Sequence, residues 1–195
     1  MKPRSVPLNI PNMLTLGRVA CIPLLVVLLL FEGRSAAFWA AMIFSVAAIT
    51  DWLDGYLARR WQEVTVLGKF LDPLADKLIV MAALIMLIPH GRIPAWAVFV
   101  LLAREILITG LRSIASSEGI VIAASNLGKY KTIFQMVAII GLLLHYDYYW
   151  FFGLRHEWLQ VSMHRFGMLY FAVAFVLTIW SGGDYLLKFF RVLCK

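Results

Sequence analysis

Four aspartates in two close pairs are the side chains of this sequence best suited to do chemistry. They are Asp51, Asp54, Asp72 and Asp76, and they lie in or beside long apolar stretches. On a helix, residues three or four apart share one face, so these acids would form two pairs. Each ionised carboxylate near the centre of a bilayer costs roughly 2.5–3.5 kcal/mol, so a cation is needed among them. Hard divalent ions prefer oxygen ligands, and the spacing therefore predicts a site for two metal ions. The alternative is a set of structural or interfacial polar residues.

The composition places these acids in a membrane protein. Hydrophobic residues make up 62% of the 195 positions and charged residues only 15%, with a mean hydropathy of +0.83. Soluble globular chains carry about 25% charged residues. The net charge of +7 then indicates contact with anionic membrane lipids, and we expect no nucleic-acid partner. Two cysteines, Cys21 and Cys194, indicate no disulfide framework.

Six apolar stretches of about the length that crosses a bilayer predict an all-α, polytopic membrane protein with six transmembrane helices. We expect one domain over residues 1–195, with residues 1–12 as a cytosolic N-terminal segment that is not a cleaved signal peptide. The segment from Asp147 to Met163 is predicted not to span. The predicted spans are Met13–Phe31, Ala36–Tyr56, Phe70–Pro89, Pro94–Ile114, Leu127–Tyr146 and Phe166–Phe189.

The distribution of basic residues predicts the orientation of these spans. An even number of spans puts both termini on one side, and most Lys and Arg residues fall on that side, so we expect it to be cytosolic. At a rise of about 1.5 Å per residue, Asp51 and Asp76 would both lie toward the cytosolic surface, where the site would open. The histidines are expected on the outer side, too scattered to act as ligands: His90, His145, His156 and His164.

The acidic residues also belong to a longer motif, Asp51-x2-Asp54-Gly55-x2-Ala58-Arg59-x8-Gly68-x3-Asp72-x3-Asp76. This motif resembles the signature of the CDP-alcohol phosphotransferase family at every position. The resemblance implies that an acceptor hydroxyl attacks the diphosphate of CDP-diacylglycerol and that CMP leaves. It also implies two bound Mg²⁺ (or Mn²⁺) ions, with the four aspartates as metal ligands and Asp76 also as the base. A homodimer formed through the membrane helices is a further implication.

The other motif positions suit the binding of a CDP-lipid. Gly55, Ala58 and Gly68 are small where a nucleotide must pack against helix backbones. Arg59 can donate two parallel hydrogen bonds to a phosphate, and Thr65 is a polar candidate for the cytidine end.

A group of cations after the motif bears on the acceptor alcohol. Arg104, Arg112, Lys129 and Lys131 would form a cationic pocket facing the same surface as the acidic site, which suits an acceptor with its own phosphate. These residues and the segment 9–18 are similar to family members that use sn-glycerol 3-phosphate, so we expect phosphatidylglycerophosphate as the product. Inositol phosphate, serine and phosphatidylglycerol are the alternative acceptors. Arg104 with Glu105 also fits an ion pair between helices, and the lysines fit positive-inside anchors.

Two residues near the start of the first span are weaker candidates for the site. Thr15 and Arg18 are candidates for contact with a substrate. The alternative for Arg18 is that it extends its charge to the membrane surface, as an arginine near a helix end commonly does.

Two other classes of protein also carry acids in membrane spans. A cation-coupled secondary transporter would place them near the midplane of repeated or broken helices, and the sequence shows no internal repeat. A membrane prenyltransferase would carry two Asp-rich segments on well-separated helices.

The predicted location is the inner (cell) membrane.

Overall fold

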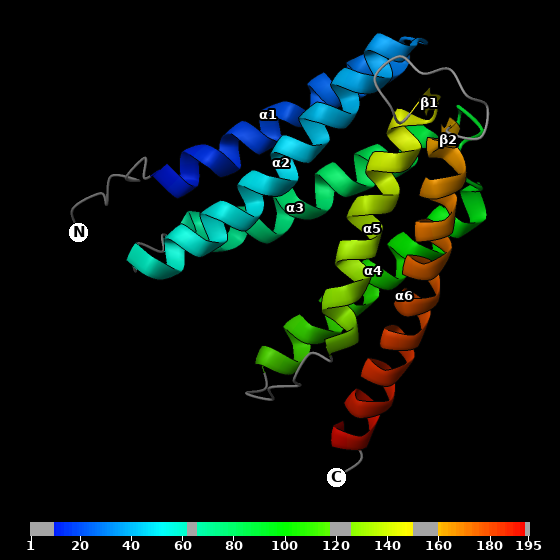
Figure 1. The fold of residues 1–195 in the computed structure, drawn as a ribbon. Coiled ribbons are helices and arrows are strands. Elements are labelled where there is room, and N and C mark those ends of the chain that lie inside the picture. Colours follow the sequence, from blue (N-terminus) through cyan, green and yellow to red (C-terminus); the bar gives the residue numbers. More distant parts are fainter. Residues whose placement is uncertain (1–9, 62–65, 118–125, 150–159, 194–195) are drawn as a thin grey trace. The chain divides into compact units, whose positions relative to one another are not determined.

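The computed structural model describes residues 10–61, 66–117, 126–149 and 160–193, although the side chains of 52–61, 66–73, Lys129 and several residues at element ends lie outside the description. Across these residues the chain forms six helices and one short pair of strands, so the predicted all-α class is confirmed apart from that pair (Figure 1). The elements are α1 (Ile10–Leu30), α2 (Arg34–Trp61), α3 (Val66–Leu87), α4 (Ala95–Ser117), α5 (Asn126–Leu144), β1 (Asp147–Tyr149), β2 (Gln160–Ser162) and α6 (Met163–Leu193). Each helix overlaps one of the six predicted spans.

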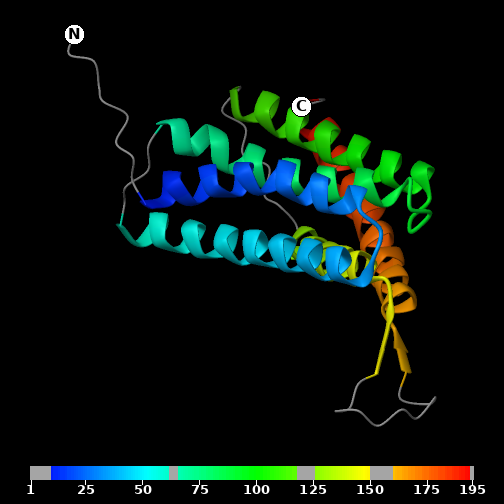
Figure 2. The same cartoon turned by 90° about the horizontal axis from the view of Figure 1, so that it is seen from above.

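The chain divides into two compact units, Met1–Met86 and Leu87–Lys195. In the first unit, α1 and α2 lie side by side and are joined by a turn that contains Gly33 (Figure 2). The φ of Gly33 is 142°, a value rare for residues with a side chain. The buried face of α2 is rich in alanine, including Ala40 and Ala47. Small side chains let helix backbones approach closely, which is the packing expected where no water drives helices together.

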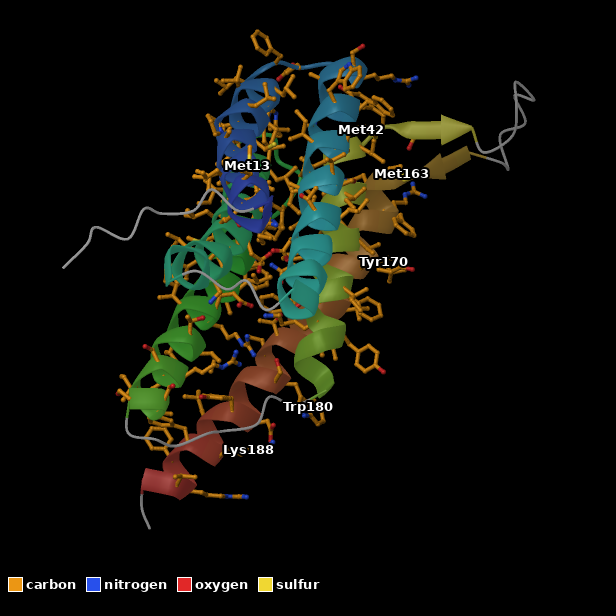
Figure 3. The ribbon with its side chains drawn as sticks, turned by 90° about the vertical axis from the view of Figure 1, so that its left-hand side faces the viewer. Met13, Met42, Met163, Tyr170, Trp180 and Lys188 are labelled. Carbon is orange, nitrogen blue, oxygen red and sulfur yellow. The ribbon has the colours of Figure 1, made fainter. Side chains whose placement is uncertain are left out.

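The second unit is built around the crossing of α5 and α6. A Cβ added to Gly141 would lie 2.9 Å from the Cα of Gly167, so these two glycines allow the backbones to meet. Helix α4 packs on α6 through a buried cluster that includes Ile108, Tyr185 and Phe189. Met163 marks the strand end of α6 and Lys188 lies near its other end (Figure 3).

Arg92 links the turn before α4 to the last residues of α5, at the end of the second unit that carries the two strands (the strand end). This buried arginine follows Gly91, which has a φ of 65°, and its Nη1 donates to the carbonyls of Leu142 and Leu143 at 3.3 and 3.0 Å. Beyond α5, the antiparallel strands β1 and β2 pair Asp147 with Ser162. The described residues between α5 and α6 thus include two strands and, as predicted, no spanning helix, but the strand pair was not predicted.

Two of the four histidines meet at this end, so the expectation that the histidines are scattered is wrong for this pair, while His156 lies outside the described residues. The Nδ1 atoms of His145 and His164 lie 3.3 Å apart, and the rings are close to perpendicular. His145 directly follows α5 and His164 lies in the first turn of α6, so the ends of these two helices bring together residues that are distant in sequence. His145 has a φ of 50°, which ends α5.

By length and apolar composition, one helix among the described residues is able to cross a membrane, Met163–Val192. Two shorter apolar helical segments, Thr15–Leu30 and Tyr130–Leu144, fall below the length of a full span. The predicted number of six transmembrane segments is therefore not established by these helices alone.

Candidate active site

The helices carry the aspartates at the predicted spacing. Asp51 and Asp54 lie three residues apart within α2, and Asp72 and Asp76 lie four apart within α3. Both helices run without interruption through these positions, so each pair shares a helix face.

The side chains of Asp51 and Asp76 are described, and both are partly exposed. The side chains of the other two aspartates lie outside the described residues, as do those of the predicted nucleotide-binding positions. No group of three or more possible metal ligands occurs among the side chains that are described. The metal cage and the nucleotide contacts therefore stay predictions. The predicted positions that lie outside are Asp54, Gly55, Ala58, Arg59, Thr65, Gly68 and Asp72.

Arg18 pairs with the first aspartate of the motif. Its Nη1 lies 2.7 Å from Oδ1 of Asp51, and its side chain is 1% exposed while that of Asp51 is 34% exposed. Thr15, one turn earlier on α1, is fully buried. An arginine that extended its charge to the membrane surface would be exposed, so that reading of Arg18 is wrong. The pair brings α1 into the site.

The second unit holds a separate polar network between α4, α5 and α6. Lys131 on α5 forms a salt bridge with Oε1 of Glu105, and Arg104 Nη1 lies 3.4 Å from the same oxygen. Arg104 Nη2 donates to Oγ of Ser181 on α6 at 2.8 Å. Two predicted acceptor-binding cations thus share one carboxylate, and the alternative of an ion pair between helices is present in the structure.

The other two predicted acceptor-binding cations are placed differently. The Arg112 guanidinium carbon lies 5.8 Å from the ring centre of Tyr185, within range of a cation–π interaction. The rest of Arg112 is exposed, which leaves it open to a ligand. The side chain of Lys129 lies outside the described residues, and its role stays a prediction.

Sequence reasoning missed the contribution of α6 to this network. Ser181 and Gly182 both lie against Arg104, and Tyr185 lies under Arg112. The signal available in the sequence was the run of small residues at 181–183 inside an apolar helix, which is typical of close contact between helices.

Comparison with known proteins identifies the family. The family model for CDP-alcohol phosphatidyltransferases matches residues 8–180. The chain belongs to this family. It is 42% identical to the CDP-diacylglycerol--glycerol-3-phosphate 3-phosphatidyltransferase of Bacillus subtilis (strain 168), over 92% of this chain and 94% of that protein. Proteins of the same name from Haemophilus influenzae and Escherichia coli (strain K12) are 40% and 41% identical, each over 91% of this chain and over 91% and 93% of their own lengths.

Family membership confirms the resemblance inferred from the aspartate motif. The matched region of this phosphatidyltransferase includes Arg18 and all four aspartates, together with the cations of α4 and α5. It ends one residue before Ser181, so the α6 residues that contact Arg104 lie just beyond it.

Proposed function

We propose that this chain transfers the phosphatidyl group of CDP-diacylglycerol to sn-glycerol 3-phosphate, giving phosphatidylglycerophosphate and CMP. The observation that carries this proposal is the similarity, at 40–42% identity along nearly the whole chain, to relatives named for that reaction. The complete aspartate motif supports it, because transfer needs a site that can neutralise a diphosphate.

The reaction is a displacement at the lipid phosphate. The acceptor hydroxyl oxygen forms a bond to the phosphorus of the phosphatidyl group, and the bond from that phosphorus to the CMP oxygen breaks. Asp76 takes the hydroxyl proton, which requires an ionised carboxylate within hydrogen-bond reach of the acceptor. Its partial exposure leaves it accessible to a polar substrate.

Two divalent metal ions, Mg²⁺ or Mn²⁺, would be held by Asp51, Asp54, Asp72 and Asp76. When bound, they supply positive charge that stabilises the diphosphate and the departing CMP. The donor set fits, because it consists of carboxylate oxygens on two helices, and the 34% exposure of Asp51 gives a cation access from solution. Arg18 holds one oxygen of Asp51 from the α1 side.

The remaining positions divide between the two substrates. Gly55, Ala58 and Gly68 give the CDP moiety room against the helices, while Arg59 and Thr65 donate to its phosphate and cytidine. The acceptor phosphate is bound by Arg112 and Lys129 together with Arg104 and Lys131, which both contact the carboxylate of Glu105. A group of four cations, of which Arg112 is exposed, suits an anionic acceptor, which favours glycerol 3-phosphate over serine.

The surface supports a polytopic arrangement in the inner membrane. Large apolar side chains lie exposed on helices of both units, among them Leu30, Phe99, Trp96 and Trp180 at 65–73% exposure. Such a surface is unfavourable in water and suits lipid tails. With six spans, both termini and the active site lie on the cytosolic side, and the apolar faces leave room for a homodimer.

Metal dependence and aspartate variants test the proposed chemistry. CMP release from CDP-diacylglycerol should stop in excess EDTA and return with Mg²⁺ or Mn²⁺. Asp51→Asn, Asp54→Asn and Asp72→Asn should each lose most activity, because an amide keeps the size of the side chain and removes its ligand charge. The matched control is Asp184→Asn, since Asp184 pairs with Lys188 on α6 and is not part of the motif. Full activity in EDTA, or in the three motif variants, would contradict the metal site.

A further inference from the structure

Arg104 is held by α6 as well as by its own neighbour Glu105. Its Nη2 donates to Oγ of Ser181 at 2.8 Å, and Ser181 Oγ in turn lies 3.2 Å from the carbonyl of Thr178. The Arg104 side chain is only 15% exposed. Its guanidinium therefore has a fixed place between two helices that are distant in sequence.

Gly182 makes that place possible. A Cβ added at this position would lie 3.0 Å from Nε and 3.1 Å from Cγ of Arg104, which is closer than side chains normally pack. The next residue, Gly183, has nothing within 4 Å of an added Cβ. The stem of Arg104 thus lies directly against the α6 backbone at Gly182, and the neighbouring glycine has no such role.

The contacts hold Arg104 without using all of its charge or all of its donors. Ser181 is neutral, and the nearby oxygen of Glu105 also pairs with Lys131. The Nε of Arg104 is buried and has no hydrogen-bond partner among the described residues. Because this Nε lies against Gly182, the donors left for an oxyanion such as phosphate are the second N–H of Nη1 and the second N–H of Nη2.

We propose that Ser181 and Gly182 are positioning residues for acceptor choice, which hold the guanidinium of Arg104 where it binds the phosphate of a phosphorylated acceptor. This inference rests on the proposed transfer to glycerol 3-phosphate. It adds α6 to the acceptor site, beyond the residues that the family model matches. The two residues act through Arg104 and do not touch the reacting atoms.

The opposite reading is that these small residues only pack α6 against α4. Packing alone would affect stability, or the KM of both substrates together. A positioning role would change the KM of one substrate only. Displacement of Arg104 weakens binding of the acceptor phosphate and leaves the CDP-lipid contacts intact.

Two glycine variants give a matched test in the purified full-length protein. Gly182→Ala should raise the KM for glycerol 3-phosphate by about tenfold, the effect of losing a charge-assisted hydrogen bond, with the KM for CDP-diacylglycerol unchanged. Gly183→Ala should match the wild type in both. Ser181→Ala should raise the same KM, and Ser181→Thr, which keeps the hydroxyl, should restore much of the loss.

A double-mutant cycle shows whether the effect passes through Arg104. In an Arg104→Ala background, Gly182→Ala should add little to the KM for glycerol 3-phosphate. Equal KM values for the two glycine variants, a parallel rise for both substrates, or full additivity with Arg104→Ala would overturn the inference. If Gly182→Ala does not fold, the two Ser181 variants decide the matter alone. The wild-type rate with glycerol 3-phosphate checks the proposed function separately.

Discussion

At the scale of single residues, the ion pair between Arg18 and Asp51 changes how the site is understood. The aspartate motif could be read from sequence because its spacing is local, within one helix at a time. The partner of Asp51 could not be predicted from sequence, because Arg18 lies on α1, more than thirty positions earlier. The Asp51 carboxylate offsets part of the cost of burying the Arg18 charge, so removing one partner leaves the other without this contact.

Arg18→Ala should destabilise the protein more than removal of an exposed arginine. An exposed ion pair contributes up to about 1 kcal/mol and loss of one partner of a buried pair costs about 3–5 kcal/mol, so a half-buried pair should lie between these values. Thermal unfolding in detergent would measure the loss, with Arg165→Ala, at an exposed position, as the control. Equal melting temperatures for the two variants would show that the pair contributes nothing.

The acceptor cations show the limit of the sequence at this scale. Arg104, Glu105 and Lys131 were recognisable because charges are rare in apolar helices, and the structure does bring them together. Ser181 and Gly182 are uncharged, and the run of small residues at 181–183 is also typical of simple helix packing. Nothing in the local sequence therefore distinguishes them from packing residues. Their role follows from which helix faces α4, and that is a property of the fold.

At the scale of elements, the helices were predictable and their contacts were not. Long apolar runs fix where α1 to α6 lie, and the boundaries agree closely with the predicted spans. The β1–β2 pair escaped prediction because strands of three residues are too short to show an alternating pattern. The crossing of α5 and α6 depends on Gly141 and Gly167, which single-sequence patterns do not pair.

Gly141→Ala should therefore disturb the crossing of α5 and α6. Its new Cβ would meet the Gly167 backbone at 2.9 Å, where neither helix can yield locally. We expect a loss of about 1–3 kcal/mol of stability, as for other overpacked cores. Gly110→Ala is the control, because an added Cβ there has nothing within 4 Å. A melting temperature unchanged in Gly141→Ala and equal to that of the control would rule out this close contact.

The stability of the protein should depend on pH through His145, at the strand end of the second unit. Burial lowers the pKa of this histidine, with Arg92, His164 and His90 acting in the same direction and Asp147 opposing them. The folded state then binds fewer protons than the unfolded state below pH about 6.5, so stability falls as the pH drops from there through the lowered pKa.

Thermal unfolding across this pH range should show the fall in the wild type and a smaller fall in His145→Asn. Asparagine suits the exchange because it tolerates the positive φ of this position. His156→Asn, a histidine outside the pair, is the control. An identical pH dependence in wild type and His145→Asn would show that His145 does not titrate in this way.

At the scale of the whole molecule, composition predicted the helical class of the protein and the aspartate motif predicted its family. The exposed apolar side chains and the six helices suit a membrane-bound member of the phosphatidyltransferase family, and the cytosolic orientation of the basic residues stays a prediction. Both substrates carry phosphate, and one is a lipid, so a cationic site at such a surface can meet them both. In the proposed function, the aspartates bind the CDP-lipid and the cations of α4 and α5 bind the acceptor.

The most direct test of this account compares two acceptors that differ only in a phosphate. Purified protein with CDP-diacylglycerol and Mg²⁺ would be given glycerol 3-phosphate or glycerol, with CMP and the lipid product quantified together. Losing the phosphate contacts should lower kcat/KM for glycerol by about tenfold or more for each cation involved, and the product with glycerol 3-phosphate should be phosphatidylglycerophosphate. Equal rates with the two acceptors, or CMP release without a phosphorylated lipid product, would contradict the account.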